Sequence, residues 1–248
     1  MKLKVIDVSK WNGNINFSEV AKAGIYGVIV RAGHGTSEDP LFLSNYINAK
    51  NAGLRVGAYW YTNCVNAKEA ATEAQAFLTA IKDKTFELPT YMDIEEQPQI
   101  ALSDKEITAV VNTFCTALEK AGYYAGIYSM DSFYARKSMQ QLQKRYTAWV
   151  AKWSENTPRY CTSFDLWQYT NTAKINGIST DVDVSYCYKD FEKIIKSKQL
   201  NGFNNKQTNS ENTRYTLKIE TPIESETKAR MLVSVLKTYG ITAQIQAL

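Results

Sequence analysis

Two acidic residues stand two positions apart at the end of an apolar run, in Met92-Asp93-Ile94-Glu95. Side chains on a β-strand alternate between its two faces with a rise of about 3.3 Å per residue, so a strand here would hold Asp93 and Glu95 on one face about 6.6 Å apart. Two like charges that close do not ionise independently, and one carboxyl keeps its proton near neutral pH while the other stays anionic. That division suits hydrolysis of a glycosidic bond, because one group protonates the leaving oxygen and the other stabilises the cation.

The same pair has two plainer interpretations, which are acids that face solvent at a strand end and half of a site for a hard metal ion. The chain has one histidine, His34, so Ser–His or Cys–His catalysis would have to use it, and a zinc hydrolase of the usual His-rich type is nearly excluded. Flanking glycines predict that His34 lies in a loop after a strand, with a loop or substrate-contact role rather than proton transfer. Carboxylate chemistry remains.

Length and composition limit the class of protein. The 248 residues suit one large α/β domain with a small appendage. The four cysteines (Cys64, Cys115, Cys161 and Cys187) form no C-x-x-C pair, so we expect buried free thiols rather than a zinc or redox site. We also expect a protein made in the cytoplasm without a signal peptide and without membrane insertion, because no apolar run of the required length occurs.

The net charge of +4 comes from the last quarter of the chain, where residues 189–248 hold 10 basic and 6 acidic residues. That end suits an anionic surface. No Lys/Arg cluster interleaved with aromatic residues occurs there, so nucleic acid is not the expected partner.

Eight apolar, β-branched or aromatic runs predict eight strands. They span residues 3–8, 26–31, 55–61, 89–95, 123–128, 146–153, 164–169 and 182–186. Helical patterns lie between the earlier runs, at residues 39–52, 67–81 and 103–121. The later connections are too short or too polar for good helices. We therefore predict an α/β fold, an irregular TIM-like (β/α) barrel of eight strands with few helices in the last third.

Acids occur where three of these strands end. Asp7 follows the first run, Asp93 and Glu95 end the fourth, and Asp181 or Asp183 lies at the eighth. Chemistry in a parallel barrel gathers at the carboxyl ends of the strands, and closure would make the first and eighth strands neighbours. Each acid taken alone is more often a turn former or a helix cap. Their convergence predicts one acidic site, with Asp7 beside Asp183 and the other pair across the mouth.

Aromatic residues also gather near the ends of the predicted strands, where exposed rings can stack on sugar faces. They are Tyr59, Trp60, Tyr61, Trp149, Trp153, Trp167 and Tyr169. We expect about half of them to face the barrel core instead, because side chains alternate along a strand. The aromatic content favours a carbohydrate substrate.

Short motifs follow one another between residue 1 and about residue 192. They are Ile6-Asp7-Val8-Ser9, Val30-Arg31-Ala32-Gly33, Ala52-Gly53-Leu54-Arg55-Val56-Gly57-Ala58-Tyr59, Asp93-Ile94-Glu95, Trp149-Val150-Ala151-Lys152-Trp153, Leu166-Trp167-Gln168-Tyr169-Thr170, and Gly177-Ile178 leading to Val182-Asp183-Val184. This ordered set resembles the glycoside hydrolase family 25 lysozymes, which include phage and bacterial N-acetylmuramidases. The resemblance implies cleavage of the β-1,4 bond between N-acetylmuramic acid and N-acetylglucosamine in peptidoglycan, without a metal or other cofactor.

The resemblance also implies roles for individual residues. Glu95 matches the catalytic acid/base, and Asp93 matches its partner, which assists the substrate's own 2-acetamido group as nucleophile. Asp7 and Asp183 match the other two acids of the site. The implied substrate-binding residues are Arg31, Tyr59, Tyr61, Trp153, Gln168 and Tyr169.

Two positions depart from the family pattern. Trp60 stands where a histidine is frequent, so that histidine is not required here. Ser185 follows Asp183-Val184 where asparagine is common, which keeps Asp181 as the reserve candidate for the fourth acid.

Beyond the predicted catalytic barrel of residues 1–195 the chain changes character. Residues 196–213 are rich in Asn, Gln, Gly and Ser, which predicts a linker. Residues 214–248 predict a small βαβ unit, faintly similar to one half of a SPOR-type peptidoglycan-binding domain. About 35 residues bury little apolar area alone, so we expect this unit to bind cell-wall polymers or to self-associate.

Together these features lead to the hypothesis of a phage endolysin, made in the host cytoplasm and acting on the wall after a partner pore releases it. A bacterial autolysin of the same chemistry, a non-catalytic wall-binding protein and a chitin-type hydrolase are the alternatives.

Overall fold

The computed structural model describes residues 2–203 and Val233, and residues 1–204 form one unit of the chain. The strands are β1 Leu3–Val8, β2 Gly27–His34, β3 Ser37–Glu38, β4 Arg55–Tyr61, β5 Thr90–Asp93, β6 Ala125–Met130, β7 Thr147–Ala151, β8 Leu166–Ala173 and β9 Val182–Cys187. The helices are α1 Phe17–Lys22, α2 Phe42–Asn51, α3 Ala67–Ile81, α4 Gln97–Ile100, α5 Asp104–Lys120, α6 Lys137–Leu142 and α7 Phe191–Ser197, with short 3-10 helices η1 Lys10–Asn12 and η2 Phe133–Ala135.

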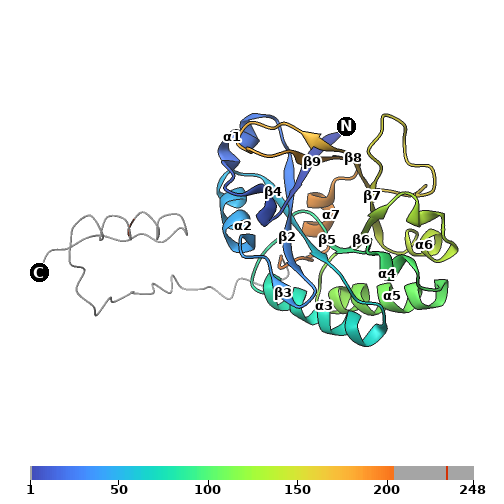
Figure 1. The fold of residues 1–248 in the computed structure, drawn as a ribbon. Coiled ribbons are helices and arrows are strands. Elements are labelled where there is room, and N and C mark those ends of the chain that lie inside the picture. The colour runs from blue at the N-terminus through green and yellow to red at the C-terminus, as the bar shows by residue number, and fades with distance from the viewer. Residues whose placement is uncertain (1, 204–232, 234–248) are drawn as a thin grey trace, which may run out of the picture. The chain divides into compact units, whose positions relative to one another are not determined.

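Eight strands close into a barrel in the order β1-β9-β8-β7-β6-β5-β4-β2, and β2 completes the circle by pairing with β1. The short strand β3 is attached to β2 as a hairpin outside this circle. Figure 1 shows the helices around the strands, and only loops connect β7, β8 and β9. The predicted barrel, with few helices in its last third, is confirmed.

The last strand runs against the expected direction. We predicted a parallel barrel, but β9 is antiparallel to both β8 and β1. Only residues 174–181 separate β8 from β9. A parallel crossover needs about a dozen residues or more, so the chain returns as a hairpin instead. The reversal brings the start of β9, where Asp183 lies, to the carboxyl ends of the parallel strands.

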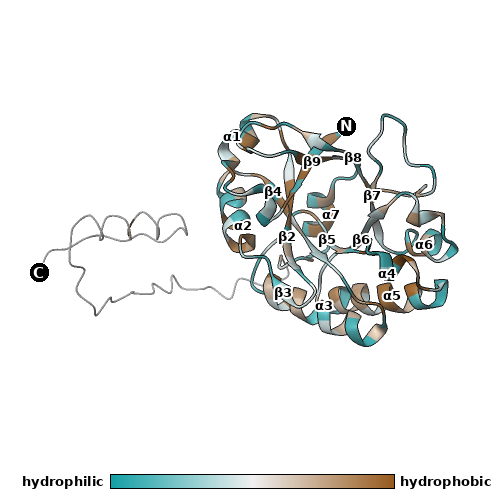
Figure 2. Ribbon diagram, viewed as in Figure 1, coloured by the Kyte–Doolittle hydropathy of each residue, from teal (hydrophilic) through white to brown (hydrophobic). Residues whose placement is uncertain are grey.

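Side-chain alternation divides the hydrophobic core into two layers. Residues such as Val5, Tyr91 and Trp149 fill the inside of the barrel. Their neighbours Ile6 and Met92 point outward and pack with residues from the surrounding helices. In Figure 2 helices α2, α3 and α5 carry both hydrophobic and hydrophilic colours, as expected for helices with one face on a sheet. All four cysteines are buried free thiols, as predicted.

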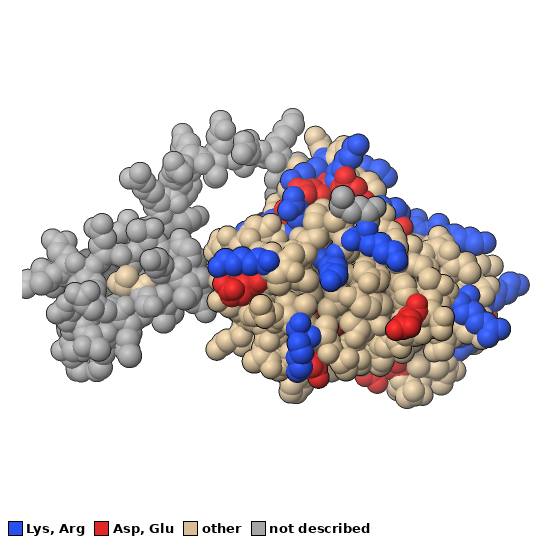
Figure 3. Space-filling model, turned by 90° about the horizontal axis from the view of Figure 1, so that it is seen from above, with Lys and Arg blue, Asp and Glu red and all other residues tan. Residues whose placement is uncertain are grey.

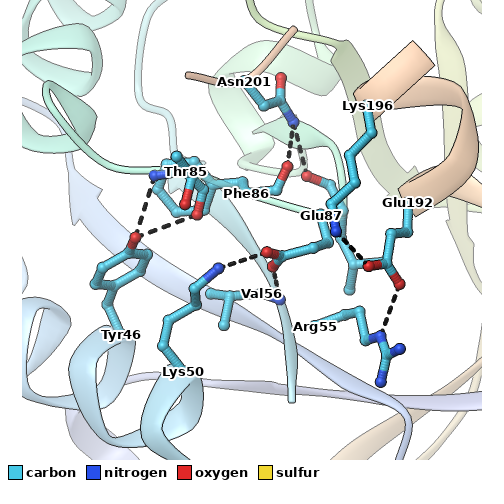
Figure 4. Close-up of polar contacts among 11 residues, drawn as sticks. Tyr46, Lys50, Arg55, Val56, Thr85, Phe86, Glu87, Glu192, Lys196 and Asn201 are labelled. Atoms are coloured by element: carbon cyan, nitrogen blue, oxygen red, sulfur yellow. Dashed lines mark hydrogen bonds and ion pairs between the residues drawn. The ribbon is translucent and has the colours of Figure 1, made fainter. Parts of the chain in front are cut away.

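Helix α7 and the residues after it belong to the barrel, which corrects the predicted start of the linker at residue 196. Phe191 and Ile195 of α7 pack into the inner core. Asn201 is fully buried. Its Nδ2 donates to the carbonyl oxygens of Phe86 (3.2 Å) and Leu88 (2.9 Å), and its Oδ1 accepts from the Tyr124 amide (2.6 Å). Figure 4 shows the two hydrogen bonds that Asn201 donates, beside the ion pair of Arg55 with Glu192. Polar residues between 196 and 203 therefore include one that is hydrogen-bonded within the barrel, and this segment is not a linker.

Apart from Val233, the rest of the predicted linker and the predicted βαβ unit of residues 214–248 lie outside the described residues. Within the described part of the chain, no helix is long and apolar enough to cross a membrane.

Candidate active site

A cleft of about 480 Å³ opens at the end of the barrel where the parallel strands finish. The residues that line it share polar or aromatic side chains. They are Asp7, Ser9, Trp11, Asn12, Arg31, Tyr59, Tyr61, Asp93, Glu95, Tyr128, Trp149, Trp153, Gln168, Asn171, Thr180, Asp181 and Asp183. All four predicted catalytic acids are in this set, as are five of the six predicted substrate-binding residues.

The four acids reach the cleft from three strands. Asp7 on β1 is directly opposite Asp183 on β9 in the strand register, as the sequence predicted. Asp93 is the last residue of β5, paired in register with Tyr61 of β4 and Tyr128 of β6. We predicted that alternation along a strand would hold Glu95 on the same face as Asp93. That prediction was wrong for Glu95, because it lies beyond the end of β5.

Burial dominates the electrostatics of these acids. It raises the pKa of Asp7 well above its usual value, and the negative charge of Asp183 adds to the effect. Burial also raises the pKa of Asp93 well above its usual value, with Glu95 adding and Arg31 opposing. The pKa of Glu95 rises to about 7 through burial and the charges of Glu96 and Asp183. The pKa of Asp183 rises to about 6, chiefly through burial. Protons are therefore retained in the cleft near neutral pH.

Gln168 connects Asp7 to the aromatic wall of the cleft. Its Nε2 donates to Asp7 Oδ2 at 2.9 Å. Its Oε1 accepts from the Tyr128 hydroxyl (3.0 Å) and from the indole nitrogen of Trp153 (2.9 Å). Trp153 is about half exposed at the rim, so this chain of hydrogen bonds runs from solvent to a buried carboxyl.

Two of the predicted substrate-binding residues form an ion pair or a hydrogen bond with an acidic side chain. Arg31 forms an ion pair with Asp39 at 2.7 Å, so its charge is largely neutralised within the protein. The Tyr61 hydroxyl donates to the Glu96 carboxylate. Burial and this hydrogen bond raise the pKa of Tyr61, so it remains a neutral donor.

Tyr169 does not reach the cleft, which corrects its predicted role in binding. It stacks on Tyr186 with ring centroids 4.2 Å apart. Its neighbour Gln168 faces the barrel interior, so alternation along β8 turns Tyr169 to the outside. Trp60 and Trp167 also pack in the outer layer of the core, whereas Tyr59, Tyr61, Trp149 and Trp153 line the cleft. The expected division of the aromatic residues is thus observed.

The comparisons decide the family. The model of one family, described as glycosyl hydrolases family 25, matches residues 6–178. The chain belongs to this family. It is 32% identical over 194 residues to Lysozyme M1 of Streptomyces globisporus, covering 72% of this chain and 65% of that protein. It is 27% identical over 183 residues to the autolytic lysozyme of Clostridium acetobutylicum, covering 73% of this chain and 55% of that protein. The chain thus spans less than two thirds of the length of either curated relative.

Solved structures agree with this assignment to family 25. The bacterial lysozyme of Streptomyces coelicolor superposes with a TM-score of 0.69 at 27% identity, covering 82% of this chain and 99% of that chain. The CTP1L endolysin superposes with a TM-score of 0.67 at 27% identity, covering 79% of this chain and 70% of that chain.

The positions of Asp181, Asp183 and His34 in this family 25 barrel distinguish the roles that the sequence left open. Asp181, the reserve candidate, is exposed at the rim and forms an ion pair with Lys174 at 2.6 Å. Asp183 lies deeper, beside Asp7, and the geometry favours it as the fourth acid of the cleft. His34 ends β2, is exposed, and contacts Asn63 and the ring of Tyr61 rather than lining the cleft.

Several residues that line the cleft were not predicted from the sequence. Trp11 and Asn12 follow β1 directly, so the rule that strand ends carry the site would have found them. Tyr128 would have followed from alternation along β6. Asn171 and Thr180 required knowledge of the β8–β9 hairpin, which the strand pattern did not reveal.

Proposed function

We propose that this protein is a lysozyme that hydrolyses the β-1,4 bond between N-acetylmuramic acid and N-acetylglucosamine in bacterial peptidoglycan. The observation that carries the proposal is the meeting of four carboxyl groups in one aromatic-walled cleft, in a chain of family 25. Its similarity to Lysozyme M1 and to the autolytic lysozyme supports the same chemistry.

In this proposal Glu95 is the catalytic acid/base. Its carboxyl is partly buried with a pKa of about 7, so a substantial fraction carries a proton at neutral pH. That proton is donated to the glycosidic oxygen as the bond breaks, and the resulting carboxylate then accepts a proton from the attacking water.

Asp93 assists the substrate. Its Oδ1 is buried and has no hydrogen-bond partner among the described residues. An unpaired buried acceptor suits the N–H of a bound 2-acetamido group, whose carbonyl oxygen then attacks the anomeric carbon. The positive charge that develops on this group stabilises the Asp93 carboxylate in return. Asp7 and Asp183 orient the sugar and set the field around Glu95.

The test is digestion of purified Gram-positive peptidoglycan by the wild type and by Glu95→Gln. Borohydride reduction and mass analysis then identify the new reducing ends. Reduced muramic acid with the wild type alone supports the proposal, and we expect a loss of at least about 100-fold in Glu95→Gln because the proton donor is removed. Reduced glucosamine, new amino termini, or wild-type turnover by Glu95→Gln would contradict it. Wall binding without any product would support the non-catalytic alternative.

We further propose that the enzyme acts as a phage endolysin, made in the host cytoplasm and reaching the wall after release. Similarity to the CTP1L endolysin supports this role, while similarity to the modular autolysin LytC of Streptococcus pneumoniae (26% identity, TM-score 0.67) keeps the autolysin alternative. Expression in Gram-positive cells with and without a pore-forming partner tests it. Lysis only with the pore supports an endolysin, and lysis without the pore supports an autolysin.

Residues 214–248 are proposed to anchor the enzyme to wall polymers or to pair two copies. In Figure 3 blue Lys and Arg side chains are spread over the described surface, with red Asp and Glu side chains between them. The basic excess that suits an anionic wall lies in residues 189–248 of the sequence. Comparison of the full chain with a chain ending at Asn204, by wall pelleting and sedimentation, tests both roles. If both forms pellet equally with walls and both sediment as monomers, the two proposed roles are contradicted.

A further inference from the structure

Glu95 occupies a position that the barrel itself does not determine. Strand β5 ends at Asp93, so the sheet's hydrogen bonds to β4 and β6 hold Asp93 but stop short of Glu95. A group that transfers a proton must be held within a fraction of an ångström of its productive position. Another contact must therefore position the backbone at Glu95.

The side chain of Gln99, in the short helix α4, provides this contact. Its Oε1 accepts hydrogen bonds from the backbone amides of Glu95 (3.1 Å) and Glu96 (3.0 Å). Its Nε2 donates to the Thr62 hydroxyl (3.0 Å) and to the carbonyl oxygen of Cys64 (3.2 Å). One carboxamide thus joins the loop that carries Glu95 to the loop that follows β4.

Gln99 is rigidly held in this arrangement. It is fully buried, and its four hydrogen bonds occupy both of its donors and both acceptor positions. Any other rotamer would leave buried amides and carbonyls without partners, which is costly.

The same network reaches the other acid of the pair. Thr62 donates from its hydroxyl to the carbonyl oxygen of Asp93 at 2.5 Å. On the opposite side, the Ser129 hydroxyl donates to the carbonyl oxygen of Ile94 at 2.6 Å. The segment from Asp93 to Glu96 is therefore held from both sides, and Gln99 is the contact made to Glu95 itself.

We propose that Gln99 is a positioning residue that aims the carboxyl group of Glu95 at the scissile bond. This inference rests on the proposed role of Glu95 in catalysis. Gln99 does not line the cleft, so it acts through the backbone of Glu95 rather than on the substrate.

The test is turnover of soluble glycan strands by the full-length Gln99→Met variant. Methionine has a similar length and volume but accepts and donates no strong hydrogen bonds. We expect kcat to fall about 10- to 100-fold because a small misplacement of the reacting group has an effect of this size, while KM stays within about twofold.

Gln143→Met is the matched control. Gln143 is also buried, and its Oε1 accepts from the Ser163 amide at 2.9 Å, so it fastens a loop that does not carry the site. We expect a comparable fall in Tm for the two variants but an unchanged kcat for Gln143→Met. Equal effects of both variants on kcat would reduce Gln99 to a structural role.

A double-mutant cycle separates this inference from the proposed function. If Gln99 acts through Glu95, Gln99→Met lowers kcat only while Glu95 is present and has no further effect in the Glu95→Gln background. An inactive Glu95→Gln with a fully active Gln99→Met would overturn the inference alone. An active Glu95→Gln would overturn both.

Thr62→Val is the second variant, for use if Gln99→Met does not fold. It is nearly isosteric and removes the hydroxyl that Gln99 contacts. We expect a fall in kcat of about 3- to 10-fold with KM retained, and unchanged kcat would count against the inference.

Discussion

At the scale of the residue, the burial of the four carboxyl groups raises their pKa values more than their closeness to one another does. Burial is the largest cause of the raised pKa of each of the four acids, and charged neighbours raise the pKa of Asp7, Asp93 and Glu95 further. Removal from water disfavours every anion, so the acids retain protons that exposed carboxyls would lose. The neighbouring charges then distinguish one acid from another.

The pH at which activity falls on the alkaline side of the pH–activity profile, its alkaline limb, depends on what raises the pKa of Glu95. After burial, the largest cause of the raised Glu95 pKa is the charge of Glu96. A carboxyl that must be protonated loses activity as pH rises through its pKa, so the limb lies near pH 7. Glu96→Gln removes a neighbouring anion, and we expect the limb to move about 0.5 to 1 pH unit lower.

The measurement is the pH dependence of kcat/KM on soluble glycan strands, which reports the ionisable groups of the free enzyme. Asp181→Asn is the control, because Asp181 is an acid at the same rim that is paired with Lys174. The limb should stay in place in this variant. An unmoved limb in Glu96→Gln would show that Glu96 does not set the proton affinity of Glu95.

At the scale of the element, the ends of strands position the site and the last helix closes the opposite end of the barrel. The hairpin that reverses β9 brings Asp183 level with Asp7. Asn201, which follows helix α7, satisfies backbone groups before β5 and β6 that would otherwise be buried without partners.

Asn201→Ala should therefore destabilise the barrel by about 1–3 kcal/mol, because it leaves two buried carbonyls and one amide unpaired. Urea unfolding measures this loss. Gln199→Ala is the matched control, since both residues have positive φ (53° and 54°) but Gln199 is exposed. Equal losses in the two variants would assign the effect to the backbone conformation rather than to the Asn201 side chain.

At the scale of the whole molecule, the site reduces the stability of the fold that carries it. The pKa of Glu95 is about 7 in the folded protein against an ordinary 4.5, so the folded state binds this proton more tightly than the unfolded state. The stabilisation that comes from binding this proton to folded Glu95 is complete below the ordinary pKa of 4.5 and is lost as pH rises through about 7.

Glu95→Gln should accordingly be more stable than the wild type at pH 8, by about 1–3 kcal/mol, with little difference at pH 4. Urea unfolding at the two pH values measures this change. Glu106 provides a control of opposite sign, because hydrogen bonds from Ser103 lower its pKa and Glu106→Gln should lose stability at pH 8. A Glu95→Gln difference independent of pH would contradict the prediction.

The amino-acid sequence was sufficient to predict the barrel, the family and three of the four acids, and it left Asp181 and Asp183 as candidates for the fourth. Strand periodicity is a local property, and the spacing of Asp7, Asp93, Glu95 and Asp183 relative to strand ends can be read without coordinates. Gln168 was predicted only through the resemblance to family 25, and Trp153 through that resemblance and the aromatic residues near strand ends.

Four features could be learned only from the folded chain: the direction of β9, the outward turn of Tyr169, the burial of Asn201 and the hydrogen bonds of Gln99. Each of these depends on which distant residues become neighbours. The polar residues of the 196–203 segment predict a linker, because the sequence does not show that Asn201 binds the carbonyl oxygens of Phe86 and Leu88. Gln99 likewise has no distinguishing local signal, because its partners at Thr62 and Cys64 come from another loop. Long-range hydrogen bonds leave no periodic trace in the sequence, and this is why they had to be observed.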